Sequence, residues 1–137
     1  MDIMRKKAQS DLKSNDVSRV LFGLYYYFHA RNAGDVSGFG ADITAHVKKV
    51  APLLKSAFKG FEQKAQSFSG ADKKRFEKKL KEFHERIEKQ QHFAQEFIKS
   101  REKEGNTKEL ENLYNALFND VNGLTHFQAG DTRKGYI

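Results

Sequence analysis

The side chains best placed to do chemistry are lysines and arginines that recur at helical spacing. Lys48, Lys55 and Lys59 follow one face of a segment between residues 43 and 68. A second basic cluster lies at the start of the next segment, and consists of Lys73, Lys74, Arg75, Lys78 and Lys79. Cations on one helix face contact a phosphate backbone, and a helix N-terminus adds positive potential of its own. The pattern therefore predicts a nucleic-acid-binding surface, and the alternative is a solvated charged face that keeps the protein in solution.

Histidines and carboxylates are placed less favourably for catalysis or metal binding. None of the five histidines belongs to a Glu-x-x-His or His-Glu-x-x-His sequence, the spacings that helical metal sites use. Glu88 and His92 are four residues apart, but both lie off the apolar stripe, which favours a surface pair. The absence of cysteine excludes disulfides, thiolate zinc sites, iron–sulfur clusters and cysteine nucleophiles. We expect no catalytic residue, no metal and no cofactor.

One spacing resembles a known catalytic motif. Arg86 and His92 form an Arg-x5-His pair, which resembles the short motif of the HEPN ribonucleases, a family of all-α proteins. The resemblance covers these two residues, with Glu88 and Gln91 as nearby polar groups, and Ile87 stands where that family usually has a polar residue. Six residues on a continuous helix are separated by about 120°, so the pair needs a break or a second subunit to converge. The resemblance implies a ribonuclease site at Arg86 and His92.

The longest apolar pattern predicts a helix over residues 71 to 104. Its apolar positions alternate steps of four and three, as in a coiled-coil seam: Phe76, Leu80, Phe83, Ile87, Gln90, Ala94 and Phe97. Ser69 and Asp72 are spaced as a capping box, and Gly105 is placed to end the helix. Three pairs at i,i+4 spacing are expected to neutralise part of its charge, namely Glu77 with Lys81, Glu82 with Arg86, and Glu85 with Lys89.

Two further helices flank this one. The segment from Ile43 to Phe68 begins at the capping residue Asp42, and Pro52 predicts a kink or break near Ala51. The last helix is expected to begin at Asn106 or Thr107, with Glu109 completing a capping box. The glycine-rich stretch 34–40 lacks the Gly-Lys-Ser/Thr of a phosphate-binding loop, so it is interpreted as an inter-helix loop.

The first third of the chain contains an aromatic run whose composition suits a strand and whose spacing suits a helix. Val17, Leu21, Leu24 and Phe28 recur at helical spacing, and Ser14-Asn15-Asp16 offers a cap before them. Consecutive aromatic residues cover most of a helix circumference, so this helix is expected to be buried nearly all round. It is either the central helix of the bundle or part of a subunit interface, with Tyr25, Tyr26 and Tyr27 as the interface residues.

Length and composition indicate one all-α domain. The chain has 137 residues and a net charge of +7, which suits a single core and a negatively charged partner. We predict an antiparallel bundle of four main helices over residues 1–128, with a possible short helix at 2–13 and a flexible tail at 129–137. The sequence contains neither a secretory signal nor an apolar stretch long enough for a membrane span, so a cytoplasmic location is expected.

These observations leave three hypotheses about function. The first is a non-catalytic helical protein whose basic faces, with the arm Arg5-Lys6-Lys7, contact nucleic-acid backbone without base specificity. The second is a protein–protein interaction module, such as a complex subunit, adaptor or inhibitor, or a homo-oligomer, that uses the aromatic helix or the heptad seam. The third is the HEPN-like ribonuclease that the resemblance at Arg86 and His92 implies.

Overall fold

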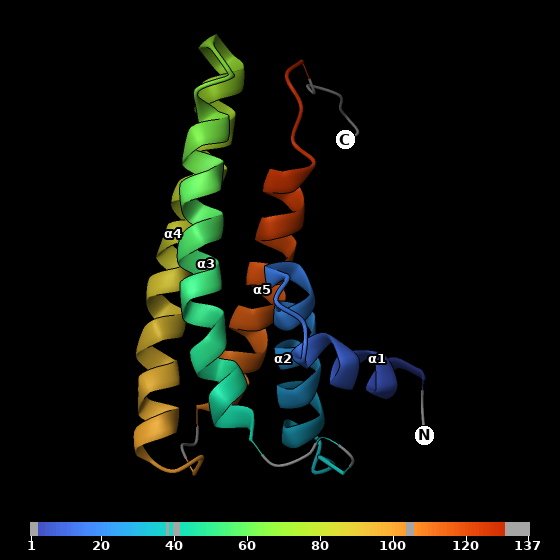
Figure 1. The fold of residues 1–137 in the computed structure, drawn as a ribbon. Helices are drawn as coiled ribbons and strands as arrows, with labels where there is room; N and C mark the ends of the chain where they lie inside the picture. Colours follow the sequence, from blue (N-terminus) through green and yellow to red (C-terminus); the bar gives the residue numbers. More distant parts are fainter. Residues whose placement is uncertain (1–2, 38, 40–41, 104–105, 131–137) are drawn as a thin grey trace.

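The protein is an all-α bundle. The computed structural model describes residues 3–37, 39, 42–103 and 106–130, and these contain helices and no strand. The helices are α1 (Ile3–Leu12), α2 (Val17–Asn32), α3 (Ile43–Ala65), α4 (Gly70–Lys99) and α5 (Thr107–Thr125). Helices α2 to α5 run antiparallel in chain order, and α1 lies across α2 (Figure 1). The predicted fold class is confirmed, including the short N-terminal helix. Among the described residues, no helix is long and apolar enough to cross a membrane.

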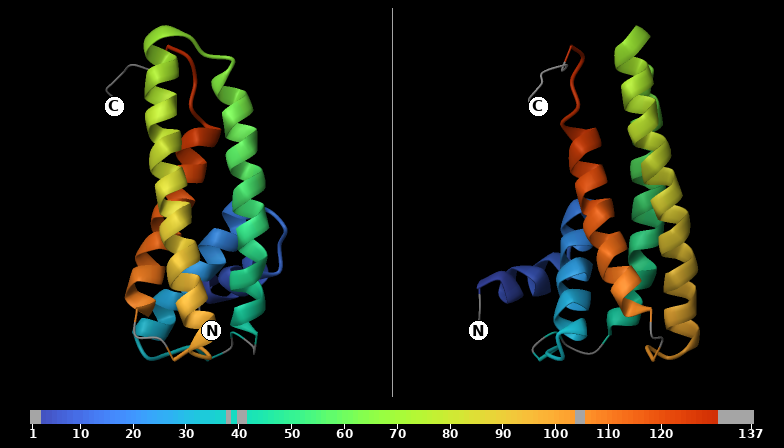
Figure 2. Two further views of the ribbon diagram at one scale, coloured as in Figure 1. Left: turned by 90° about the vertical axis from the view of Figure 1, so that its left-hand side faces the viewer. Right: turned by 180° about the vertical axis from the view of Figure 1, so that it is seen from behind.

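A long α3–α4 hairpin forms one side of the bundle, and the shorter α2 and α5 form the other. Figure 2 shows that α2 lies beside only one half of the hairpin, whereas α5 continues toward its far end. In the half that contains α2, Phe28 packs against Phe97 and Tyr114. At the far end, Phe68, Phe76 and Phe127 pack against one another, with ring centroids 5.2 Å apart.

The aromatic run forms helix α2, as its spacing predicts. The Asp16 side chain accepts a hydrogen bond from the Arg19 backbone N–H at 3.1 Å and caps the helix. The expected burial is only partial, because Tyr27 and Phe28 are buried while Tyr25 and Tyr26 are half-exposed. The reason is that α2 has neighbours on some sides only: it packs mainly on α1, α3 and α5, and it meets α4 through Phe28 and Phe97.

Helix α1 crosses α2 at a glycine. A Cβ atom on Gly23 would lie 2.9 Å from Leu12 Cγ and 3.0 Å from the Ala8 carbonyl oxygen, so only glycine fits without a shift. Lys49 of α3 holds the end of α1 by donating to the carbonyl oxygens of Leu12 and Ser14. These contacts fix α1 on the bundle through its C-terminal half.

The break predicted near Ala51 is absent. Helix α3 continues through Pro52, whose side chain is exposed. Proline removes one backbone hydrogen bond, and a carbonyl left free on the solvent side of a helix bonds water instead. The Asp42 cap is confirmed, since its side chain accepts from the Ala45 backbone N–H at 3.1 Å.

The helix expected over 71–104 ends earlier, at Lys99. Arg101 and Glu102 adopt positive φ angles of 57° and 68°, and the Glu102 N–H returns to the Phe97 carbonyl. Contacts with other helices hold Glu102 there, because Arg31 donates to its backbone oxygen and Thr44 to its carboxylate. Gly105, the expected stop, lies outside the described residues.

The two capping boxes expected at the other helix starts do not form. The Ser69 side chain makes no capping hydrogen bond, and Asp72 accepts instead from Arg75 and from the Gly130 backbone N–H. Asn106 precedes α5 without a side-chain cap, since its amide donates to Glu96. Of the tail expected at 129–137, residues 131–137 lie outside the described part of the chain.

Candidate polyanion interface

Helix α3 carries an exposed row of lysines on one face. Lys48, Lys55 and Lys59 fall within a sector of about 40° on a helical projection and span about 16 Å along the axis. All three side chains are exposed, and none forms an ion pair with a described residue. The α3 helix contains a single acidic residue, Glu62. The row therefore presents nearly uncompensated positive charge.

The other two lysines of α3 have structural roles. Lys49 donates to the end of α1, as described above. Lys64 donates to the carbonyl oxygens of Leu124 and Thr125, both at 2.8 Å, and so caps the C-terminus of α5. Burial lowers the pKa of both amines, because a charged group loses hydration there. This division leaves Lys48, Lys55 and Lys59 as the lysines of α3 that are available to a partner.

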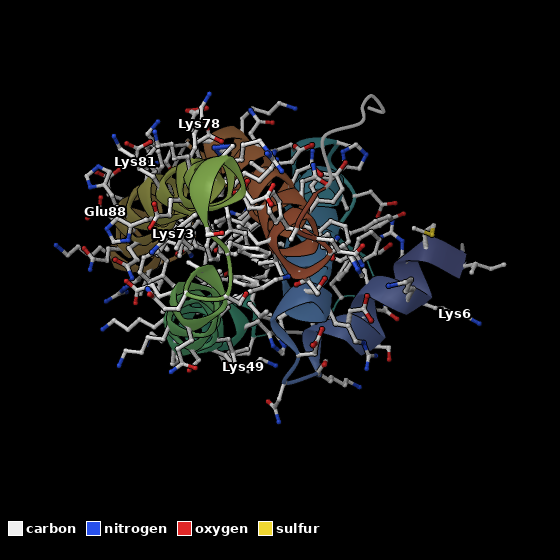
Figure 3. The ribbon with its side chains drawn as sticks, turned by 90° about the horizontal axis from the view of Figure 1, so that it is seen from above. Lys6, Lys49, Lys73, Lys78, Lys81 and Glu88 are labelled. Carbon is white, nitrogen blue, oxygen red and sulfur yellow. The ribbon has the colours of Figure 1, made fainter. Side chains whose placement is uncertain are left out.

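The basic cluster at the start of α4 divides between two sides of that helix. Lys73 lies near α3, while Lys78 points away from the bundle (Figure 3). Arg75 pairs with Asp72 of the same helix at 2.7 Å and lies over the ring of Phe127, just beyond the end of α5. Lys79 lies on this same side, where its charge opposes the rise that burial causes in the pKa of Asp120. Arg75 and Lys79 are thus separated from the row on α3, whereas Lys73 lies beside that helix (Figure 3).

The i,i+4 ion pairs expected along α4 are absent. The described residues of α4 pair instead as Asp72–Arg75, His84–Glu88 and His92–Glu96, and Arg86 reaches across to Asp120 on α5. The prediction was wrong because a solvent-exposed pair contributes less than about 1 kcal/mol, too little to fix long side chains. Lys81 is consequently exposed and forms no ion pair with a described residue, although sequence reasoning had assigned it to Glu77. Lys74, Lys78 and Lys81 follow helical spacing, and this pattern could have identified Lys81 as part of the basic surface.

We use the name α3–α4 lysine surface for the α3 row together with the lysines in the first turns of α4, Lys79 excepted, none of which forms an ion pair within the described chain. Its members are Lys48, Lys55, Lys59, Lys73, Lys74, Lys78 and Lys81. Its α3 half is almost free of acidic residues, whereas Glu77, Glu85 and Glu88 lie among its α4 neighbours. The positive potential is therefore strongest along α3 and the first turns of α4.

Arg86 and His92 both line a groove between α4 and α5. The groove has a volume of about 1050 Å³ and an apolar floor that includes Phe93, Leu113 and Ala116. Each of the two side chains has its own carboxylate partner, since Arg86 Nε lies 3.2 Å from Asp120 Oδ2 and His92 Nε2 lies 3.1 Å from Glu96. The helix is unbroken between them. No group of three or more His, Cys, Asp or Glu residues that could hold a metal ion occurs in the part of the chain that the structure describes.

The polar atoms near Gln91 belong to a different, smaller pocket. It has a volume of about 360 Å³, lies between α3 and α4, and is lined by Lys48, Gln90, Gln91 and Gln95 among apolar neighbours. Gln90 is buried and donates to the Tyr114 hydroxyl at 2.8 Å. Gln90 thus occupies its heptad position by pairing with a core tyrosine of α5.

The three tyrosines expected at an interface have different surroundings. Tyr27 belongs to the core, where it packs on Phe28 and Phe39 and accepts a hydrogen bond from Arg31 at 3.1 Å. Tyr25 and Tyr26 are half-exposed and stack around His29. Sequence reasoning missed Phe22 and Phe118, whose rings join this cluster from α2 and α5 with centroids 5.8 Å apart.

Comparisons with known proteins add no relative, because no protein-family model, no curated protein and no solved structure matches this chain.

Proposed function

We propose that this protein is a non-catalytic binding protein that contacts a polyanion, specifically a nucleic-acid backbone, through the α3–α4 lysine surface. The observation that supports it is the row of Lys48, Lys55 and Lys59, exposed on one face of α3 and without ion pairs among the described residues. A lysine that has no partner in the protein is free to neutralise a phosphate, and this releases a counterion from the nucleic acid.

The geometry favours backbone contact over base recognition. Lysine is a compact, flexible point charge, whereas specific contacts to guanine usually come from the rigid fork of arginine. The nearby arginines of α4 are held by carboxylates, Arg75 by Asp72 and Arg86 by Asp120. The lysine row is about 16 Å long, which corresponds to about five base pairs at 3.4 Å each. A protein of this kind binds many sequences with similar affinity.

A charge-reversal variant with a matched control tests the proposal. Lys48→Glu/Lys55→Glu/Lys59→Glu is compared with Lys6→Glu/Lys13→Glu/Lys103→Glu, which changes the net charge equally at exposed positions outside the α3–α4 lysine surface. Fluorescence anisotropy with a labelled duplex of mixed sequence gives the dissociation constant of each variant. We expect the α3 variant to lose about tenfold or more in affinity, and the control clearly less. Equal losses in the two variants would mean that only net charge matters and that the row is not the binding site.

A further inference from the structure

The side of the bundle opposite the lysine surface is poor in charge and rich in aromatic and amide side chains. On α2, Phe22, Tyr25, Tyr26 and His29 follow i, i+3, i+4, i+7 spacing. The same spacing on α5 places asparagines around one phenylalanine, in the series Asn115, Phe118, Asn119 and Asn122. We call these eight residues the α2–α5 face.

The two helices of this face are joined into one surface. The rings of Phe22 and Phe118 lie 5.8 Å apart across the helix boundary, and the Ser18 hydroxyl lies 3.3 Å from the Asn122 side-chain oxygen. From Asn112 onward, the only charged residue of α5 is Asp120, which is turned toward Arg86 of α4. The face itself therefore carries no fixed charge apart from the titratable His29.

The cations that border this face are paired with carboxylates, and two of them share one carboxylate. Lys7 and Arg19 both pair with Asp11, and Arg5 pairs with Asp35 at 3.1 Å. His29 Nδ1 lies 3.0 Å from the carboxylate of Glu111. This arrangement is the reverse of the α3–α4 lysine surface, where the lysines have no carboxylate partners. The net charge of +7 is thus distributed unequally between two sides of the molecule.

We infer that the α2–α5 face is the surface through which two copies of this chain associate. In a two-fold symmetric interface each patch meets the same patch of its copy, so unpaired charges would meet like charges. A chain with a surplus of +7 avoids that repulsion by associating through a face where charge is absent or paired. Phenylalanine and tyrosine rings pack on their own kind, and asparagine both donates and accepts hydrogen bonds, so these residues are self-complementary.

The composition of the face suits the centre of a dimer contact. Its four residues on each helix span about 10 Å along the axis, so the rest of a standard contact of roughly 800 Å² per partner would lie on the flanking turns of α2 and α5. Enrichment in aromatic residues and depletion of lysine and glutamate characterise the buried centre of such interfaces.

Complementary charge variants of the face provide the test. Sedimentation of the nuclease-treated full chain over a concentration series is expected to show a monomer–dimer equilibrium that persists at high salt. Asn115→Lys/Asn119→Lys and Asn115→Glu/Asn119→Glu each place like charges opposite their copies, so each variant alone is expected to dimerise at least tenfold more weakly. An equimolar mixture of the two is expected to restore the dimer, because opposite charges then meet across the interface. That restoration also shows that both variants are folded.

The control is Gln63→Lys/Gln95→Lys, which adds the same charge at exposed positions on α3 and α4 and is expected to dimerise like the unmodified chain. Three results would overturn the inference: a monomer at every concentration, a dimer that the asparagine variants leave unchanged, or a mixture that fails to associate. A chain that associates only with a different protein would remain a monomer at every concentration in this experiment. All measurements are made without nucleic acid, so they are independent of polyanion binding.

Discussion

Asp120 is a carboxylate whose burial outweighs its ion pair. Arg86 lies 3.2 Å from Asp120 Oδ2, yet that oxygen has no hydrogen-bond partner in the described part of the chain. Burial raises the pKa of Asp120 to about 6, Arg86 and Lys79 act in the opposite direction, and Glu82 adds to the rise. The charged form of this side chain is therefore disfavoured by the fold.

This pKa has a consequence for stability. The folded state holds the Asp120 proton more tightly than the unfolded state does. The contribution of this protonation to the free energy of unfolding is therefore fully present below about pH 4 and is lost as the pH rises through about 6. We expect Asp120→Asn to increase the free energy of unfolding at pH 7.5 by roughly 1–3 kcal/mol and to change it little at pH 4. Urea unfolding at the two pH values measures this, with the exposed Glu88→Gln as control. A variant less stable than the unmodified chain at pH 7.5 would show that the Arg86 pair outweighs burial.

The pair of Gln90 and Tyr114 is the polar contact inside the heptad seam. Both side chains are buried, and the Gln90 amide donates to the tyrosine hydroxyl at 2.8 Å. We expect Gln90→Leu and Tyr114→Phe each to lower the free energy of unfolding by about 1–3 kcal/mol, because each leaves a buried polar group without its partner. The double variant is expected to be more stable than the sum of the two losses predicts, as a double-mutant cycle by urea unfolding can show. Strictly additive losses would mean that the two side chains are not coupled.

At the scale of elements, the position of α1 depends on one close approach. Gly23→Ala would place a methyl group against Leu12 and the Ala8 carbonyl, so we expect a loss of roughly 1–3 kcal/mol in unfolding free energy. Gly123→Ala is the matched control, since that site has open space, and alanine there is expected to stabilise α5 by about 0.5–1 kcal/mol. Thermal unfolding of both variants makes the comparison. Two variants of equal stability would contradict the close packing of α1 on α2.

The helices could be predicted from sequence because the spacing of apolar residues along the chain is a local property. The lysine row on α3 follows from helical spacing in the same way. Helix ends were less predictable, since Glu102 ends α4 through contacts with Arg31 and Thr44 from other helices. The aromatic cluster on α2 and α5 was only partly predicted from sequence, because adjacent residues on a helix point about 100° apart. Tyr27 is therefore buried beside the half-exposed Tyr26, while the contribution of Phe118 depends on which helix lies next to α2.

At the scale of the whole molecule, the bundle has two unlike sides. Helices α3 and α4, which carry the lysine surface, lie on one side, and α2 and α5 lie on the other, as the view along the bundle shows (Figure 3). A dimer through the α2–α5 face would leave a lysine surface exposed on each copy. Binding of a polyanion and association of the chain would thus use different helices of the bundle.

The salt dependence of duplex binding shows whether the α3 lysines neutralise phosphates. The logarithm of the association constant for a duplex is measured against the logarithm of salt concentration, for the unmodified chain and for Lys48→Ala/Lys55→Ala/Lys59→Ala. Each lysine that neutralises a phosphate contributes a slope of about −0.9, so the variant is expected to have a slope shallower by about 2 to 3. An unchanged slope would contradict the assignment of the α3 row as the nucleic-acid contact.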